Sequence, residues 1–440
     1  MEKSNVSLRE EGNGLLETHV RWDEVEEKMR DELKTEARFG PKKSITHIGE
    51  GNGFLSRIGL ITCDWINSKE GENLPEKFAL KMTSGLASKV FEDSSLGEAM
   101  PSHEMSPEEL EHFEGYIREL HNAEVIVYEF LRKFENEVAV AKCHFAIPFT
   151  EKNKLSGSIA LEYIKTPKVF HIYNYIPLDQ VKEVSRALGK IQALSVINGI
   201  EDIEKLKDAD LFSGMWDSFT EDILKMLFSS LTQMDKSPEM KTIVEDIIEV
   251  VPDYRGSNLV TTIHTQYGVS PVLVNGDLWS ANLLFDSETG HLRALIDWQI
   301  SHQGVGVEDL LRITFAGLST KDRHDNMDDL LEEMYCSMEE HLNGHKVPYT
   351  RKEMYELYEI LLPHCGFFLA PVIIPLFQTT MKQAGVNEEE KQKRMGIVLD
   401  KVRGICEDIV MYHKKNQSRN RHFEWKEPNW NTRTNPFKRE

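Results

Sequence analysis

The sequence predicts an α+β fold of two lobes, a small antiparallel sheet followed by a larger and mostly helical lobe. From about Ile45 to Ile164, short apolar runs alternate with polar residues, which is typical of half-buried strands. After about Thr166 the apolar residues recur every three or four positions over long stretches, which indicates helices. A cleft is expected where the two lobes meet.

A leading amphipathic helix that docks on one face is predicted before the first lobe. From Thr18 to Ala37, apolar residues recur at helical spacing among charged ones, at Trp22, Val25, Met29 and Leu33. Five apolar runs then predict strands, at residues 45–49, 54–65, 77–82, 143–149 and 158–164. One helix interrupts them, from Ser106 to about Phe134. Residues 83–105 are rich in Ser, Gly and acid and are expected to form a surface loop.

The second lobe is predicted to contain helices near 178–197, 216–233, 237–250, 321–343, 350–383 and 387–413, with one β segment at 271–299. The most apolar run, Gly366 to Phe377, is too short to cross a bilayer and carries Pro371 and Pro375, which favours a buried helical hairpin. The expected parts are an N-terminal helix and extension (1–40), the sheet lobe (41–165), the helical lobe (166–413) and a polar tail (414–440).

Composition excludes several classes of function. The 440 residues carry 73 acidic and 52 basic side chains, a formal charge of −21, which argues against a nucleic-acid or membrane partner. The five cysteines are far apart and never paired as C-x-x-C, so neither a disulfide framework nor a structural zinc site is expected. The N-terminus lacks the features of a signal peptide, and a cytoplasmic location is predicted.

The first candidate site is the glycine turn formed by Gly49, Gly51 and Gly53 between two predicted strands. Glycine has no Cβ, so the backbone N–H groups of such a turn can approach a phosphate closely. A hairpin turn that needs positive φ explains the same pattern equally well. The turn is neither a Walker A loop nor a dinucleotide fingerprint, because no Gly-Lys-Ser/Thr follows and the next element is a strand.

The second candidate is Lys81, in a strand whose alternation sends Phe78, Leu80 and Met82 to one face and Lys81 to the other. A lysine on the face below the glycine turn could neutralise nucleotide phosphates, although a solvated edge lysine is the commoner case. A buried lysine needs a partner. Glu124, set among apolar residues of the predicted helix, is the natural one, and Glu119 or Glu129 would serve in another register.

The strongest candidate set is Asp277, Asn282 and Asp297, each at the end of an apolar run. Phosphoryl transfer needs a carboxylate that orients the attacking hydroxyl and oxygen ligands that hold Mg²⁺ on the phosphates. The spacing from Asp277 to Asn282 equals that of the kinase catalytic loop, D-x-x-x-x-N, and a second acid follows on the next predicted strand. A β-hairpin with Asp and Asn as turn formers is the alternative explanation.

With these motifs in this order, the chain resembles the aminoglycoside phosphotransferase and choline kinase superfamily, and more closely its CHK kinase-like or ecdysteroid-kinase-like branch, over residues 45–410. The resemblance implies a protein-kinase-like bilobal fold with ATP between the lobes. It also implies a G-loop at 49–53, an ATP-binding lysine at Lys81, a helix acid at Glu124, a catalytic Asp277, and metal ligands at Asn282 and Asp297. The hinge would fall at 159–164, with Glu162 as the gate residue and Tyr163 beside it.

Two positions depart from the family pattern. Asn275 stands where relatives show the histidine of H-G-D, and Ile191-Gln192-Ala193 stands where relatives often read L-H-A. The histidine mainly buttresses the loop, and asparagine can also form hydrogen bonds. Asp309 resembles the family's D-L step after the metal-binding strand, and we interpret it as a helix cap or an ion-pair partner.

The predicted function is transfer of a phosphoryl group from Mg-ATP to the hydroxyl of a small molecule, sterol-like or amino-alcohol-like. Trp279 and Trp298 could form an aromatic wall for such an acceptor, or belong to the core, which is favoured for Trp279. The alternative is a nucleotide-binding pseudokinase that acts as an interaction module, supported by Asn275. A protein kinase proper is disfavoured, because no room follows Asp297 for an activation loop. The acceptor and the oligomeric state stay open.

Overall fold

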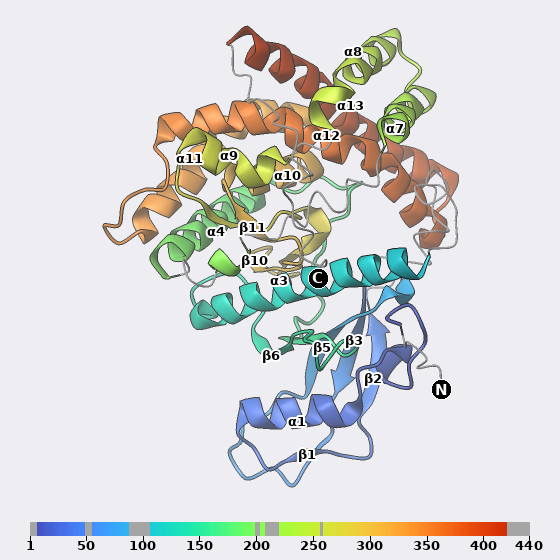
Figure 1. Ribbon diagram of the computed structural model, residues 1–440, viewed down its shortest axis with the longest axis vertical. Coiled ribbons are helices and arrows are strands. Elements are labelled where there is room, and N and C mark those ends of the chain that lie inside the picture. Colours follow the sequence, from blue (N-terminus) through green and yellow to red (C-terminus); the bar gives the residue numbers. More distant parts are fainter. Residues whose placement is uncertain are drawn as a thin grey trace.

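The computed structural model describes residues 7–48, 55–87, 106–198, 203–206, 220–255 and 258–419, and the side chains of 382–384 are left aside. These residues form the predicted α+β fold (Figure 1), with a sheet lobe at one end and a helical lobe at the other. Within the described ranges, the sheet lobe contains a five-stranded antiparallel sheet of order β2-β3-β5-β7-β6. Its strands are β2 (Ser44–Ile48), β3 (Ser56–Thr62), β5 (Lys77–Thr83), β6 (Cys143–Ile147) and β7 (Ser158–Glu162). The predicted fold class is confirmed.

Strand β5 lies at the centre of this sheet and places Lys81 on its inner face. Lys81 is paired with Ile58 of β3 on one side and with Ile159 of β7 on the other. The alternation of the strand sends Phe78, Leu80 and Met82 to the opposite face, where they are buried. That face is covered by α1 (Trp22–Leu33), whose Val25 and Met29 complete a small core.

The helix α3 (Pro107–Leu131) lies between the sheet and the helical lobe (Figure 1). Ser106 begins it, because the Ser106 side chain accepts a hydrogen bond from the backbone of Glu109 while the Glu109 side chain bonds the backbone of Ser106. A short 3-10 turn, η3 (Arg132–Phe134), follows it. The N-terminal segment also anchors this helix: Leu8 is buried against Ile117, and its N–H donates to Glu114 over 2.9 Å.

The helical lobe is built from helices that were mostly predicted. They are α4 (Leu178–Asn198), α7 (Glu221–Met234), α8 (Pro238–Tyr254), α9 (Leu259–Tyr267), α10 (Val307–Gly317), α11 (Thr320–His341), α12 (Arg351–Ala384) and α13 (Glu388–Ser418). The β segment is two small antiparallel pairs, β9 (Leu283–Phe285) with β10 (Leu292–Leu295), and β8 (Val272–Val274) with β11 (His302–Gly304). These pairs hold the segment at the lobe interface.

Helix α12 corrects the prediction of a helical hairpin at Gly366–Phe377. The segment lies inside one continuous helix that contains Pro363, Pro371 and Pro375. A proline inside a helix costs about 3 kcal/mol, but α12 packs on α10 and α13, and its burial outweighs that cost. By length and composition alone, Arg351–Met381 is apolar enough to cross a membrane, because its most apolar window has a mean hydropathy of 2.1. Because 78% of its most apolar window is buried inside the molecule, a core helix fits the same observation.

Helix α13 crosses the helical lobe and ends at Ser418, five residues beyond the predicted end of that lobe at 413. Its last turns are held by an ion pair of Lys414 with Asp246 at 2.8 Å and by Lys415 with Glu359 at 2.8 Å. Residues 420–440, which include Trp425 and Trp430, lie outside the described residues.

Lys401 of α13 is buried beneath the segment that connects the lobes. Its Nζ donates to three backbone carbonyls, of Ile172 at 2.8 Å, Asn174 at 2.6 Å and Ala316 at 2.6 Å. Ala316 lies in the last turn of α10, whose terminal carbonyls have no partner within the helix. The ammonium therefore joins three parts of the chain, the connecting segment, α10 and α13.

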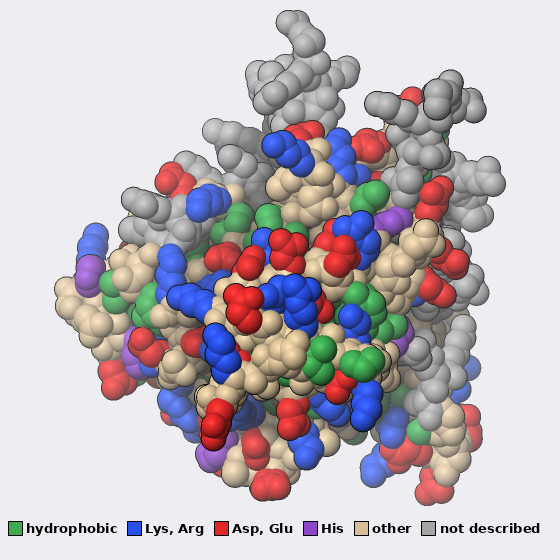
Figure 2. Space-filling view, turned by 90° about the horizontal axis from the view of Figure 1, so that it is seen from below, with side chains coloured by type: hydrophobic (Ala, Val, Ile, Leu, Met, Phe, Trp, Pro, Cys, Tyr) green, Lys and Arg blue, Asp and Glu red, His purple; other side chains and the backbone are tan. Residues whose placement is uncertain are grey.

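Figure 2 views the molecule from the sheet-lobe end and shows acidic and basic side chains interspersed over that face. The surplus of 21 negative charges is thus not gathered there. Interspersed charges of both signs give this face little net field.

Candidate active site

Lys81 makes two ion pairs at the junction of the lobes. Its Nζ lies 2.6 Å from Oε2 of Glu124 on α3 and 2.8 Å from Oδ1 of Asp297, which follows β10. Lys81 is only 8% exposed. Burial lowers the pKa of Lys81, but the two carboxylates more than offset that effect and raise the pKa above its ordinary value. Lys81 therefore carries its positive charge at neutral pH.

Glu124 connects α3 to both sides of this cluster. Its Oε2 accepts a hydrogen bond from Nζ of Lys81, and its Oε1 accepts one from the backbone N–H of Trp298 at 3.4 Å. Glu119 and Glu129, the two alternative partners, are both exposed. The predicted pairing of Lys81 with Glu124 is therefore present, and it brings together residues 81, 124 and 297 of the sequence.

The loop after β8 carries Asp277. Gly276 has φ +81°, and a Cβ there would lie 2.6 Å from the carbonyl oxygen of Ile300, so the turn requires glycine. Asn282 lies five residues on, at the end of a short 3-10 turn, η5 (Ser280–Asn282). Its Nδ2 donates to the backbone carbonyl of Asp277 at 2.9 Å, which fixes the orientation of the amide.

The charge of Asp297 affects the protonation of Asp277. Burial, followed by repulsion from the Asp297 carboxylate, raises the pKa of Asp277 to about 7, although Arg312 and Lys81 oppose the rise. A carboxyl group whose pKa lies near neutral pH can take up and release a proton under working conditions. Asp297 has φ +61°, the left-handed region that residues other than glycine rarely adopt.

Asp309 has a different role from the expected helix cap. Helix α10 begins after Gly306 without a side-chain cap, and Asp309 lies in its first turn. Its two carboxylate oxygens accept hydrogen bonds from the backbone N–H groups of Asn275 at 2.8 Å and Gly276 at 2.9 Å. Burial and the adjacent Glu308 raise the pKa of Asp309 to about 6. Asp309 thus holds the loop that carries Asp277.

A buried cluster of His302, Glu308 and Arg312 near the Asp277 loop was not predicted. Nε2 of His302 lies 3.0 Å from Oε2 of Glu308, whose other oxygen accepts from Nε of Arg312 at 2.9 Å. The only sequence signal for these contacts was the pair of neighbouring acids, Glu308 and Asp309, in an apolar frame. Buried acids without partners would be costly, so their presence already implied cations nearby.

The other predicted site residues are placed as follows. Gly49, Gly51 and Gly53 lie outside the described residues. Glu162 is the last residue of β7, and its side chain accepts from the backbone N–H of Lys142 at 3.1 Å. Tyr163 follows where the chain leaves the sheet for the helical lobe.

The two tryptophans differ from the expectation. Trp298 is buried in the main core, whereas Trp279, next to Asp277, is only partly buried. Trp298 is only 1% exposed and therefore offers no surface to an acceptor. Trp279 is the tryptophan that retains an exposed part near the carboxylates.

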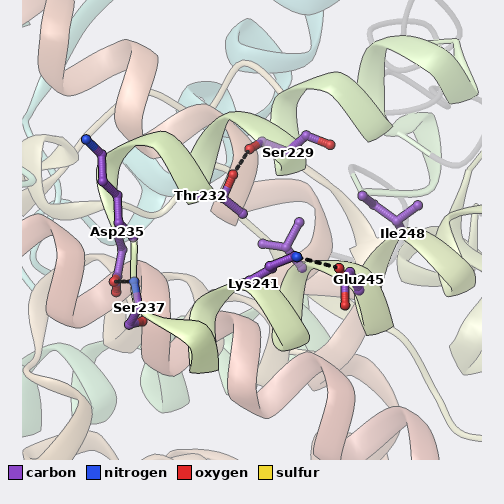
Figure 3. Close-up of a pocket in the computed structure, with 9 residues that line it drawn as sticks. Ser229, Thr232, Asp235, Ser237, Lys241, Glu245 and Ile248 are labelled. Carbon is purple, nitrogen blue, oxygen red and sulfur yellow. Dashed lines mark hydrogen bonds and ion pairs between the residues drawn. The ribbon is translucent and has the colours of Figure 1, made fainter.

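Two cavities in the described part of the helical lobe lie apart from these residues. One, of about 380 Å³, lies between α7 and α8, and Figure 3 shows its lining. Its polar groups are largely engaged: Asp235 is bonded to Arg403 and to the backbone of Ser237. The other, of about 550 Å³, lies between α4, α11 and the β9–β10 hairpin. Neither is lined by a predicted site residue.

The donor set at the junction suits a hard cation. Mg²⁺ prefers oxygen ligands and usually keeps several waters and phosphate oxygens, so a protein needs to supply only one or two groups. Asp297 offers the oxygen not bonded to Lys81, and Asn282 has its Oδ1 left over from the bond made by its Nδ2. The described residues contain no cluster of three His, Cys, Asp or Glu side chains that could hold a metal on its own. The arrangement therefore fits a metal shared with phosphates.

The model of one protein family, described as DUF1679, Uncharacterized oxidoreductase dhs-27, matches residues 8–417. That is most of the chain, and the chain belongs to this family.

Two proteins of Caenorhabditis elegans are similar in sequence. The chain is 26% identical over 148 residues to Uncharacterized kinase-like protein D1044.1, which covers 32% of this chain and 38% of that protein. It is 24% identical over 281 residues to Uncharacterized oxidoreductase dhs-27, which covers 60% of this chain and 31% of that protein. The matches thus span less than half of either relative. The kinase-like match agrees with the superfamily that the motifs predict, and the CHK kinase-like branch stays a prediction.

Two solved structures are similar in shape. One is a putative aminoglycoside phosphotransferase from Ralstonia eutropha, with 12% identity, coverage of 89% of this chain and 98% of the other, and a TM-score of 0.42. The second is choline kinase from Cryptosporidium parvum, with 11% identity, coverage of 86% and 91%, and a TM-score of 0.44. The assignment of the bilobal fold comes from the strand order of the sheet and from the two lobes described above, and does not depend on these two similarities.

Proposed function

We propose that this member of the DUF1679 family is a small-molecule kinase, which transfers the γ-phosphoryl group of Mg-ATP to a hydroxyl group. The observation that carries the proposal is the lysine held between two carboxylates at the lobe junction, with Nζ distances of 2.6 Å to Glu124 and 2.8 Å to Asp297. One carboxylate would be enough to neutralise the buried ammonium group of Lys81. The second carboxylate, which α3 does not supply, suggests a lysine aligned for a ligand that contacts both lobes.

The chain's own residues would act through charge and position. Lys81, fixed by Glu124, would bind the α- and β-phosphates, whose negative charge it complements. Asp277 would orient the acceptor hydroxyl and accept its proton, which suits a pKa of about 7. The backbone beside Glu162 and Tyr163 would bind the adenine edge, and the glycine turn at 49–53 would cover the phosphates.

Asn282 and Asp297 would hold the Mg²⁺. When bound, the metal neutralises charge on the phosphates and fixes their orientation. The fixed amide of Asn282 supports this role, because the bond from Nδ2 to the Asp277 carbonyl leaves only the amide oxygen for a ligand. The same hydrogen bond would hold the amide oxygen of Asn282, the proposed metal ligand, at a fixed position relative to Asp277.

The acceptor is proposed to be sterol-like or amino-alcohol-like. Trp279 is partly exposed beside Asp277 and offers an aromatic face for either a flat apolar ring system or a cationic amine. The overall charge of −21 favours the amine slightly.

The direct test measures ADP release from Mg-ATP over a panel of sterols, amino alcohols and sugars. Asp277→Asn is the negative control, and Asp329→Asn, which alters an exposed aspartate of α11, is the matched neutral control. We expect a signal that depends on one acceptor class, survives in Asp329→Asn and is lost in Asp277→Asn. No acceptor-dependent signal above that of Asp277→Asn would contradict the kinase.

The alternative, a nucleotide-binding pseudokinase, predicts binding without turnover. Nucleotide at about 100 times its dissociation constant should stabilise the fold by about 2.7 kcal/mol. Stabilisation without turnover on the full panel would favour the pseudokinase. No stabilisation by Mg-ATP would contradict both functions.

An oxidoreductase activity is not supported by this part of the chain. A dinucleotide-binding fold needs a parallel sheet with a helix directly after the glycine turn. Here the glycine turn is followed by β3, and the named strands described above pair in antiparallel fashion. Oxidation of NADH or NADPH can be followed in the same panel, and we expect none.

A further inference from the structure

Asn275, which stands where the kinase superfamily shows the histidine of H-G-D, forms hydrogen bonds to both functional loops with one side chain. Its Nδ2 donates to the backbone carbonyl of Asp297 at 3.0 Å, and its Oδ1 accepts from the backbone N–H of Asp277 at 3.0 Å. Asn275 is fully buried. A carboxamide has one donor end and one acceptor end, and each is matched here to a group of the opposite kind.

The backbone on both sides of this bridge is held in unusual conformations. Asp297 has φ +61° and Gly276 has φ +81°. A left-handed residue other than glycine costs about 1 kcal/mol or more and persists only when its surroundings fix it. The bond from Asn275 Nδ2 to the Asp297 carbonyl is one of the contacts that can fix it.

Asn275 is itself anchored by its backbone. Its N–H donates to Asp309 at 2.8 Å, and its carbonyl oxygen accepts from the Ser301 hydroxyl at 3.4 Å. The side chain therefore extends from a fixed point, and a fixed carboxamide sets the spacing of the groups at its two ends. Those groups are the peptide N–H of Asp277 and the peptide C=O of Asp297.

We propose that Asn275 is a positioning residue that couples the Asp277 loop to the Asp297 turn and sets the distance between the two carboxylates. The role in catalysis rests on the proposed kinase function, whereas the coupling itself does not. Aspartate at this position would keep the acceptor for Asp277 but lose the donor to Asp297, and leucine would lose both. A neutral histidine has one donor and one acceptor, so it can keep both.

The coupling is tested by amide hydrogen exchange of the full chain with Asn275→Leu, Asn275→Asp and Asn275→His. In Asn275→Leu we expect faster exchange both at 275–282 and at 294–300, with the strands β2 and β3 unchanged. In Asn275→Asp only 294–300 should loosen, and Asn275→His should restore protection in both. Ser301→Ala is the matched control, because it removes only the longer of the two bonds that anchor the Asn275 backbone and leaves the bond to Asp309 and the bridge in place.

Exchange in Asn275→Leu that rises in only one of the two segments would overturn the coupling. So would equal loosening in Ser301→Ala. If Asn275→Leu is too unstable to measure, Asn275→Asp replaces it, because faster exchange at 294–300 alone is diagnostic by itself. Equally faster exchange of both segments in Asn275→Asp would also overturn the proposal.

The catalytic part is tested by steady-state kinetics. A displacement of about 1 Å at reacting groups can cost about 10²-fold in rate. We therefore expect kcat of Asn275→Leu to fall about 10- to 100-fold, while KM for ATP stays within about threefold. A rise in KM with kcat unchanged would overturn the positioning role. If the wild-type chain turns over no acceptor, the proposed function fails, and the exchange pattern still decides the coupling.

Discussion

Among the described residues, two lysines are buried, and they are stabilised in opposite ways. Lys81, in the sheet lobe, faces two carboxylates, and these raise its pKa. Lys401, in the helical lobe, is 1% exposed and faces three backbone carbonyls. Burial lowers the pKa of Lys401 to about 7, with Asp400 opposing the shift.

The difference teaches how a buried charge can be recognised as functional. Three carbonyl dipoles satisfy the donors of one ammonium group and tie neighbouring segments together, which is a structural task. Two full negative charges around one positive charge leave a net negative cluster, which is costly unless another cation joins it. Lys401 therefore ties segments of one lobe together, whereas we propose that a ligand completes the cluster of Lys81.

The largest expected effect is on activity, from Lys81→Met. We expect turnover to fall by about 10³-fold, because a preorganised cation facing the phosphates is lost. Stability should fall as well, because Glu124 loses its buried partner, but proton uptake by Glu124 limits that loss. Acceptor-dependent ADP release and urea unfolding of the same variant measure both quantities. A large loss of stability with activity retained would reverse the assignment.

Lys401→Met should show the opposite pattern. Three buried carbonyls lose their partner, and each unsatisfied buried group costs about 1–3 kcal/mol. We expect the free energy of unfolding to fall by about 3 kcal/mol, while nucleotide affinity of the folded protein is unchanged. Urea unfolding and a nucleotide titration below the unfolding transition are the measurements. Weakened nucleotide binding would place Lys401 in the active site.

The pH dependence of stability separates the two lysines further. The pKa of Lys401 in the folded state, about 7, lies below the value of about 10.4 in the unfolded chain. The unfolded chain then binds the proton more tightly, so stability rises as pH increases from 7 towards 10. The penalty of Lys401→Met should therefore grow by about 2 kcal/mol between pH 7 and pH 9. A constant penalty would show that the carbonyl dipoles hold the proton.

The last expected effect has the opposite sign and concerns Asp277, whose folded-state pKa of about 7 lies above its unfolded value. Ionised Asp277 thus costs stability, and the loss develops as pH rises from about 4 to about 7. The free energy of unfolding of Asp277→Asn should exceed that of the wild type by up to about 4 kcal/mol at pH 8 and equal it at pH 4. Thermal unfolding at both pH values is the test. An equal difference at both would exclude a titrating cause.

Much of the fold could be predicted because its elements have regular patterns. The alternation around Lys81 and the capped helix that carries Glu124 gave the sheet lobe almost completely. The nine residues of α9 were missed, since so short a helix shows barely two turns of periodicity. Helix α12 was predicted over its length, but its prolines suggested a hairpin that its packing overrides.

The candidate site was predictable where a charged residue stands among apolar residues of the same strand or helix. Lys81 in an apolar strand and Glu124 in an apolar helix are such cases. Asp309, Asn275 and Lys401 act through contacts with segments 22 to 229 residues away, which leave no spacing signal. Lys401 did leave a trace, because it lies beside the apolar stripe of Val398 and Val402 on α13.

The separation of 216 sequence positions between Lys81 and Asp297 also affects folding during synthesis. Ribosomes add about 5–20 residues per second, so the sheet lobe, complete at Glu162, waits at least about seven seconds for the turn that carries Asp297. During that interval the inner face of α3 has no neighbour from the helical lobe. A nascent chain at this stage is a natural client for chaperones, and slow codons between the lobes would prolong its exposure.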